Sequence, residues 1–126
     1  MSQTPQRHPP LAVGVDIGGT WIRAVVLRDG RATRRVRRAR GLPQLSKILR
    51  MLLGRQRRFG SLVVAARGIW TAAERSGLQR RLRPLAAHVE VISDAEAALL
   101  GALGGQPGLL ILAGTGSIVL GRDRRG

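Results

Sequence analysis

The sequence predicts an α/β fold in which helices flank a mixed sheet. Near the start of the chain, three segments with strand-like patterns follow one another. Beyond them, segments with apolar residues at helical spacing alternate with short apolar segments. The expected elements are strands at 11–17, 21–27 and 31–38, a helix at 44–58, a strand at 61–66, a helix at 71–82, a strand at 89–92 and a helix that begins at Ser93. An antiparallel meander therefore leads into βαβ units, which is typical of layered α/β domains.

Turn residues separate the first three expected strands. Segment 11–17 is apolar and rich in β-branched residues, and it ends at Gly18-Gly19-Thr20. Asp29-Gly30 closes the second strand. Arginine fills most of segment 31–38. Because charged side chains block unwanted strand pairing, we expect this segment to be an edge strand.

Each expected helix has its own signal. The helix at 44–58 carries an apolar stripe formed by Leu45, Ile48, Leu49 and Leu52. We expect the helix at 71–82 to be broken or shortened at Gly77, because glycine is a poor helix former. The last helix opens with the capping-box pattern Ser93-Asp94-Ala95-Glu96, in which Ser93 is the N-cap residue and Glu96 follows three residues later.

Residues 104–108 form the most linker-like segment of the chain, since three of the five residues are glycine and one is proline. Apolar segments at 109–113 and 118–120 follow, and we expect the first to be a buried strand. The expected organisation is a disordered leader at 1–10, a domain at 11–104, a linker at 105–108 and, at 109–126, the first hairpin of an incomplete second domain.

Composition excludes several classes of protein. A chain of 126 residues with 44% hydrophobic and 23% charged residues can bury one modest core. The absence of cysteine excludes disulfides, cysteine-based zinc sites and iron–sulfur ligands within the sequence. No apolar run approaches the ~18 residues of a membrane span, and the first ten residues do not resemble a signal peptide. We therefore expect a cytoplasmic protein without a membrane partner.

The chain is strongly basic, with 22 basic residues, 7 acidic residues and a formal net charge of +15. Such an excess indicates either a polyanionic partner, such as nucleic acid, or arginines that simply cover a solvated surface. The aromatic residues are Trp21, Phe59 and Trp70, too few for a base-stacking platform. Nucleic acid is therefore not the expected partner.

Two similar glycine turns interrupt apolar strands. Gly18-Gly19-Thr20 follows the first strand, and Gly114-Thr115-Gly116-Ser117 lies between the last two apolar segments. Each turn either closes a tight β-hairpin or cradles phosphate, because glycines allow close approach of the backbone and successive N–H groups bind anions. Neither turn is a P-loop or a dinucleotide fingerprint, since no Gly-Lys-Ser/Thr follows and each leads into a strand. The presence of two such glycine turns in one short chain favours phosphate binding.

Two aspartates accompany these turns. Asp16 precedes the first turn, where its carboxylate would either hold Mg²⁺ beside phosphates or cap the turn. Asp94 follows a strand and opens a helix, so it either interacts with the helix dipole or accepts a proton from an attacking hydroxyl. The capping box alone accounts for Glu96.

Three motifs resemble those of the actin/Hsp70/hexokinase superfamily of ATP-dependent phosphotransferases and ATPases. Val15-Asp16-Ile17-Gly18-Gly19-Thr20 is similar to the first phosphate motif. Ile92-Ser93-Asp94-Ala95-Glu96-Ala97-Ala98-Leu99 is similar to the first connecting segment. Leu112-Ala113-Gly114-Thr115-Gly116-Ser117-Ile118 is similar to the second phosphate motif. Within the superfamily, the sequences of the motifs most resemble those of the BadF/BadG/BcrA/BcrD-type ATPases and N-acetylglucosamine kinases.

This resemblance implies two ribonuclease-H-like domains with ATP and Mg²⁺ between them, and phosphoryl transfer to a sugar hydroxyl, with an amino sugar as the expected substrate. It implies that Asp94 is the general base and that Asp16 positions Mg²⁺. The two glycine turns would hold the β- and γ-phosphates from opposite domains, through Gly18, Gly19, Thr20, Gly114, Thr115, Gly116 and Ser117.

The chain also departs from the family pattern. It stops about ten residues after the second phosphate motif, so we expect a truncated N-terminal part, with little kinase activity in isolation and exposed apolar surface that favours a homodimer. Where relatives tend to have a small Ala-Gly segment, this chain has Ala66-Arg67-Gly68, and Arg67 would contact an anionic group or point to solvent. The alternatives to a sugar kinase are an activator ATPase of a CoA dehydratase and a non-catalytic fragment that binds polyanions.

Overall fold

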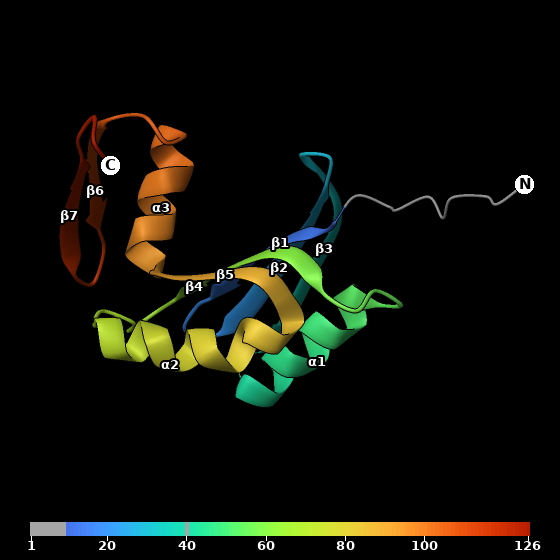
Figure 1. Cartoon of the computed structure of the whole chain (residues 1–126). Helices are drawn as coiled ribbons and strands as arrows, with labels where there is room; N and C mark the ends of the chain where they lie inside the picture. Colours follow the sequence, from blue (N-terminus) through green and yellow to red (C-terminus); the bar gives the residue numbers. More distant parts are fainter. Residues whose placement is uncertain (1–9, 40) are drawn as a thin grey trace, which may run out of the picture.

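The computed structural model describes residues 10–39 and 41–126, with the backbone alone described for Leu42. The leader expected at 1–10 lies outside the described residues, apart from Pro10. A mixed five-stranded sheet with the order β3-β2-β1-β4-β5 forms the centre of the fold (Figure 1). Its strands are β1 (Ala12–Ile17), β2 (Trp21–Arg28), β3 (Arg31–Ala39), β4 (Phe59–Ala66) and β5 (Ala86–Ser93). The expected α/β fold with a mixed sheet is confirmed.

Strand directions match the expected meander followed by βαβ units. β1 is antiparallel to β2, and β2 is antiparallel to β3, which lies at the edge as its arginines predict. β4 lies parallel to both β1 and β5. The carboxyl ends of β1, β4 and β5 therefore lie at the same edge of the sheet.

The hydrophobic core lies between the sheet and the helices α1 (Leu42–Leu53) and α2 (Ala72–Leu82). The expected apolar stripe of α1 is fully buried in this core and consists of Leu45, Ile48, Leu49 and Leu52. Leu62 and Val64 of β4 face it from the sheet, with no exposed surface. Full burial of this kind stabilises the fold by roughly 1.5–3 kcal/mol for each large aliphatic side chain.

Two details of the helices differ from the sequence prediction. α1 ends at Leu53, not at 58, because Gly54 adopts φ +58°, outside the helical region. α2 runs through Gly77 without a break, so the break expected there is wrong. A capping box of Thr71 and Glu74 closes the first turn of α2, and this local stabilisation outweighs the ~1 kcal/mol that one glycine costs.

The strands β4 and β5 are longer than expected, because each begins before its apolar run. β5 starts at Ala86, and its exposed residues Ala87 and His88 extend the ladder with β4, where His88 pairs with Ser61. A short 3₁₀ helix, η1 (Arg83–Leu85), leads from α2 into this strand. The start of β5 combines backbone pairing with burial, since Ala86 pairs with Phe59 and both side chains lie in the core.

A separate two-stranded sheet consists of β6 (Gly108–Ala113) and β7 (Ser117–Arg122). It packs beside α3 (Asp94–Leu103), as Figure 1 shows. The expectation that segment 109–113 is buried is wrong: Leu109 is 73% exposed and Ile111 68% exposed. α3 lies against one side of this hairpin, so the side that carries these residues faces solvent. The domain limits expected at 105–108 stay a prediction.

Within residues 10–39 and 41–126, no helix has the length and apolar character needed to cross a membrane.

Candidate functional site

The site begins at the edge of the sheet where three parallel strands end. Ile17 of β1 pairs with Ala66 of β4, which in turn pairs with Ser93 of β5. The next residue along each strand is Gly18, Arg67 and Asp94 respectively. Open α/β sheets bind ligands at the carboxyl ends of their strands. The register therefore places the first glycine turn and Asp94 at a position suited to ligand binding. Arg67 follows β4, which lies between β1 and β5 in the sheet.

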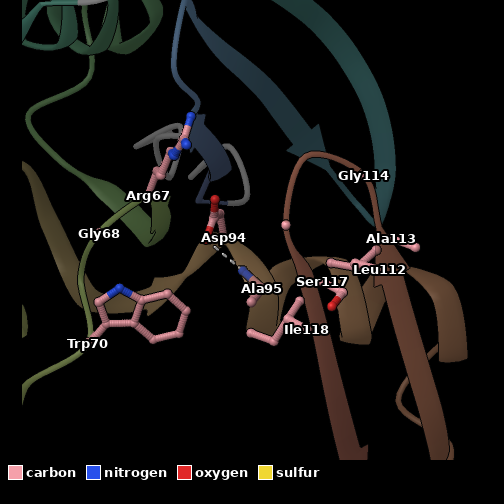
Figure 2. Close-up of a pocket in the computed structure, with 11 residues that line it drawn as sticks. Arg67, Gly68, Trp70, Asp94, Ala95, Leu112, Ala113, Gly114, Ser117 and Ile118 are labelled. Atoms are coloured by element: carbon pink, nitrogen blue, oxygen red, sulfur yellow. Dashed lines mark hydrogen bonds between the residues drawn. The ribbon is translucent and has the colours of Figure 1, made fainter.

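A cavity of about 610 Å³ opens at this edge, facing the turn between β6 and β7 (Figure 2). Its lining consists of Arg67, Gly68, Trp70, Asp94, Ala95, Leu112, Ala113, Gly114, Gly116, Ser117 and Ile118. Of the expected site residues, Asp94 and three of the four residues of the second glycine turn thus share one cavity. Asp16, the first glycine turn and Thr115 do not line it.

Asp94 is held in place by the first turn of α3. The Ser93 side chain, 1% exposed, accepts a hydrogen bond from the Glu96 N–H (3.1 Å) and caps the helix. Asp94 Oδ1 accepts from the N–H of Ala95 at 2.9 Å, as Figure 2 shows. Asp94 therefore interacts with the start of α3 and lines the cavity at the same time. Its Oδ2 atom takes no part in the hydrogen bond with Ala95.

Glu96 has the structural role that its spacing predicts. One of its carboxylate oxygens accepts from the Ser93 N–H at 2.7 Å. Arg75 of α2 donates to the same carboxylate, Nη1 to Oε1 at 3.2 Å, and its Nη2 lies 2.9 Å from Oε2. Burial raises the pKa of Glu96, but the hydrogen bonds from Ser93 and Arg75 outweigh it and hold the pKa below its usual value. Sequence reasoning missed Arg75, because its contact depends on how α2 packs.

Asp16 lies beside the first turn, on the strand that leads into it. Its Oδ2 is 3.5 Å from Nη1 of Arg23, its direct cross-strand partner on β2. Both side chains are substantially exposed, at 45% and 59%, so this ion pair is weak. Mg²⁺ in phosphate sites uses one or two carboxylates, substrate oxygens and water. One accessible carboxylate beside a glycine turn fits that mode, whereas the described residues contain no cluster of three ligands for an all-protein cage.

The first glycine turn is compact and open to solvent. Gly18 N–H donates to Trp21 O at 2.9 Å and closes the turn, while Gly19 and Thr20 are exposed. A Cβ atom built on Gly19 would lie 2.9 Å from Arg67 Nη1. Arg67, which also lines the cavity, therefore joins the first turn to the cavity wall.

The second glycine turn links β6 to β7. Gly114 N–H donates to Gly116 O at 2.9 Å, and all four residues of the turn are exposed. Trp70, 57% exposed, lies on the wall of the same cavity. Sequence reasoning missed Trp70 as a site residue; the available signal was an aromatic residue in a loop just after a strand end.

Comparison with solved structures identifies sugar kinases with the same fold. A Chromobacterium violaceum protein assigned as an N-acetylglucosamine kinase matches with a TM-score of 0.67 and 26% identity, over 93% of this chain and 46% of that chain. The inorganic polyphosphate/ATP-glucomannokinase of an Arthrobacter species (strain KM) matches with a TM-score of 0.57 and 22% identity, over 90% of this chain and 58% of that chain. Both neighbours are sugar kinases of the actin/Hsp70/hexokinase superfamily.

The chain thus has a sugar-kinase-like fold and spans about half the length of these solved structures. No protein-family model matches it, and no curated protein matches it in sequence. The narrower resemblance to BadF-type ATPases stays a prediction.

Proposed function

We propose that this chain supplies acceptor-binding and phosphate-binding residues of an ATP-dependent sugar kinase that uses Mg²⁺. The observation that carries the proposal is the shared cavity. Asp94, at the carboxyl end of β5, lines one space of about 610 Å³ together with Gly114, Gly116 and Ser117 of the second glycine turn. That volume lies within the range of small-molecule sites. The sugar-kinase neighbours support the reaction class.

In this proposal Asp94 is the general base. The sugar hydroxyl attacks the γ-phosphorus, the bond to the β,γ-bridging oxygen breaks, ADP leaves, and the hydroxyl proton passes to the Asp94 carboxylate. The hydrogen bond from Ala95 to Oδ1 orients the carboxylate, which leaves Oδ2 for the hydroxyl. Catalysis of this type consists mainly of positioning and charge stabilisation.

The glycine turns supply the phosphate contacts. The N–H groups of Gly18 and Gly114 close the two turns through backbone hydrogen bonds. The N–H groups of Gly19 and Thr20, and those of residues 115–117, would bind phosphate oxygens from opposite sides. Asp16 would hold Mg²⁺ beside them, and the metal would neutralise charge on the β- and γ-oxygens. In this assignment residues 109–126 begin the second nucleotide-binding domain.

An amino sugar is the proposed acceptor. The name of one structural neighbour includes N-acetylglucosamine, and the exposed ring of Trp70 gives the cavity an apolar surface against which a sugar can pack. Because the name of the other neighbour includes inorganic polyphosphate, that polymer is a second donor to test.

Tryptophan fluorescence tests the proposal on the chain as it exists. In Trp21→Phe, Trp70 is the single tryptophan and reports on the cavity. We expect saturable fluorescence changes with N-acetylglucosamine or glucosamine and with Mg·ATP. Asp94→Asn should lower the affinity for the sugar by about tenfold, the scale of one hydrogen bond to a charged group, and should leave the affinity for Mg·ATP unchanged. No response to any sugar, or loss of both ligands together, would contradict the assignment of Asp94.

A second candidate function, polyanion binding, is favoured by one observation. β3 exposes Arg31, Arg34, Arg35, Arg37 and Arg38. Arg37 stacks on Trp21, with its guanidinium carbon 3.8 Å from the ring centroid. Arg37 therefore covers one face of this tryptophan ring. Polyanion binding through these arginines should weaken steeply between about 50 and 200 mM salt, and replacement of the arginines should abolish it. Mg·ATP binding at the glycine turns should instead depend on Asp16.

A further inference from the structure

Arg67 lies where the first glycine turn and the cavity meet. Its N–H donates to Ile17 O at 3.1 Å, which fixes its backbone beside the carboxyl end of β1. Its Nη1 lies 2.9 Å from the position that a Cβ atom on Gly19 would occupy. Figure 2 shows Arg67 next to Asp94 at the same end of the cavity, whose wall contains both residues. The guanidinium thus lies beside the first turn, on a residue that shares the cavity wall with Asp94.

This guanidinium is also uncompensated within the described part of the chain. The two ion pairs there join Arg23 to Asp16 and Arg75 to Glu96. Arg67 takes part in neither, although Asp94 is its neighbour on the cavity wall. An exposed cation beside the first glycine turn attracts an anionic ligand.

We propose that Arg67 contacts the phosphoryl group that is transferred. This inference rests on the proposed kinase function. If the first turn holds the donor phosphates and Asp94 holds the acceptor hydroxyl, the phosphoryl group must pass between them. Arg67 lies beside the first turn and shares the cavity wall with Asp94. A guanidinium donates two parallel N–H groups to phosphate oxygens, and in phosphoryl transfer the charge is spread over the equatorial oxygens. Arg67 therefore binds the γ-phosphoryl group and stabilises it during transfer.

The proposal predicts discrimination between a triphosphate and a diphosphate. Isothermal titration calorimetry on the full chain with Mg·AMP-PNP and Mg·ADP measures it directly. We expect Arg67→Gln to lower the affinity for Mg·AMP-PNP by about tenfold or more, the scale of a hydrogen bond to a charged group. The affinity for Mg·ADP should fall by less than about threefold. Arg67→Lys should restore part of the lost affinity, because it keeps the charge but not the paired donors.

Arg57→Gln is the matched control, since this exposed arginine precedes β4 at the strand's opposite end. It removes the same charge and should change both affinities by less than about threefold. Because Arg67 is exposed, its variants should retain the circular dichroism spectrum of the wild type. Arg67→Ala provides a second variant for the same comparison.

The outcomes separate this inference from the function on which it rests. If Arg67→Gln leaves Mg·AMP-PNP affinity unchanged while Asp16→Asn lowers it, Arg67 has no such contact and the kinase proposal stands. Equal losses of affinity for Mg·AMP-PNP and Mg·ADP, or a loss of affinity for the sugar alone, also refute the γ-phosphoryl contact. If the wild-type chain binds neither nucleotide, the kinase proposal and this inference both fail.

Discussion

Arg75 of α2 and Glu96 of α3 form a two-pronged ion pair, with Nη2 and Oε2 2.9 Å apart and a second hydrogen bond of 3.2 Å between Nη1 and Oε1. The same carboxylate completes the capping box with Ser93. One side chain therefore closes the first turn of α3 and ties it to α2. Because Asp94 is the first residue of that turn, this pair also fixes the position of the proposed general base.

Replacing Glu96 tests this link. Glu96→Ala removes the reciprocal cap and the partner of Arg75, and we expect the free energy of unfolding to fall by about 1–2 kcal/mol. Urea denaturation measures the change. Glu90→Ala is the control, because Glu90 is exposed on β5 and should change stability by less than about 0.5 kcal/mol. Equal effects of the two substitutions would show that the cap contributes nothing specific.

The two capping glutamates make stability depend on pH. Hydrogen bonds from the Thr71 and Trp70 backbones hold the pKa of Glu74 below its usual value, and the pKa of Glu96 is also lowered. A carboxyl group with a lower pKa in the folded state stabilises that state above its unfolded pKa of about 4.5. This contribution is lost as the pH falls through the folded-state pKa.

We therefore expect the free energy of unfolding to fall as the pH drops below about 4.5, and to fall less in Glu74→Gln/Glu96→Gln than in the wild type. Urea denaturation at a series of pH values between neutrality and about pH 3 provides the comparison. Parallel curves for the two proteins would mean that other carboxylates dominate acid unfolding.

Gly77 offers a stabilising substitution. It lies inside α2, and a Cβ atom at this position would meet nothing within 4 Å. Gly77→Ala should raise the free energy of unfolding by about 0.5–1 kcal/mol, because alanine restricts the unfolded chain and favours the helix. Thermal and urea denaturation would both report it.

Gly54→Ala is the matched comparison for Gly77→Ala. Gly54 has equally open surroundings but a φ of +58°, which alanine adopts only with strain. It should therefore destabilise the chain by about 1 kcal/mol or more. The same sign for both substitutions would show that backbone conformation does not decide the outcome.

The hairpin β6–β7 presents an exposed apolar face. Ile111 pairs directly with Val119, and the two side chains are 68% and 62% exposed, next to Leu109. Exposed apolar patches favour association. We expect self-association that rises with concentration in sedimentation velocity experiments and weakens in Ile111→Lys/Val119→Lys. The control Met51→Lys/Ala73→Lys adds the same charge at exposed positions of α1 and α2 and should leave association unchanged.

The elements that sequence analysis predicted best are those whose signals are local. The stripe of α1, the capping box at Ser93 and the edge position of β3 each follow from residues within one segment. The break at Gly77 was wrong because caps at the helix start compensate for one poor residue. The burial of segment 109–113 was wrong because apolar composition indicates what a strand tends to bury, not whether another element covers it.

The same distinction holds for the site. Asp94 and both glycine turns were predicted from motifs, and the structure brings Asp94 and three residues of the second turn to one cavity, whereas the first turn lies outside its lining. The proximity of Arg67 to Gly19 depends on the parallel register of β1 and β4, which no local pattern reveals. The pairing of Arg75 with Glu96 depends in the same way on how two helices pack.

If both glycine turns bind the phosphates of ATP, their backbone amides should respond to the nucleotide. Amide chemical shifts of the ¹⁵N-labelled chain, recorded during titration with Mg·ATP, measure this response. We expect the largest changes at Gly18, Gly19, Thr20, Gly114, Thr115, Gly116 and Ser117, and we expect Asp16→Asn to reduce them. Changes confined to the arginines of β3, unaffected by Asp16→Asn, would contradict phosphate binding by the turns and assign the anion-binding surface to that edge strand.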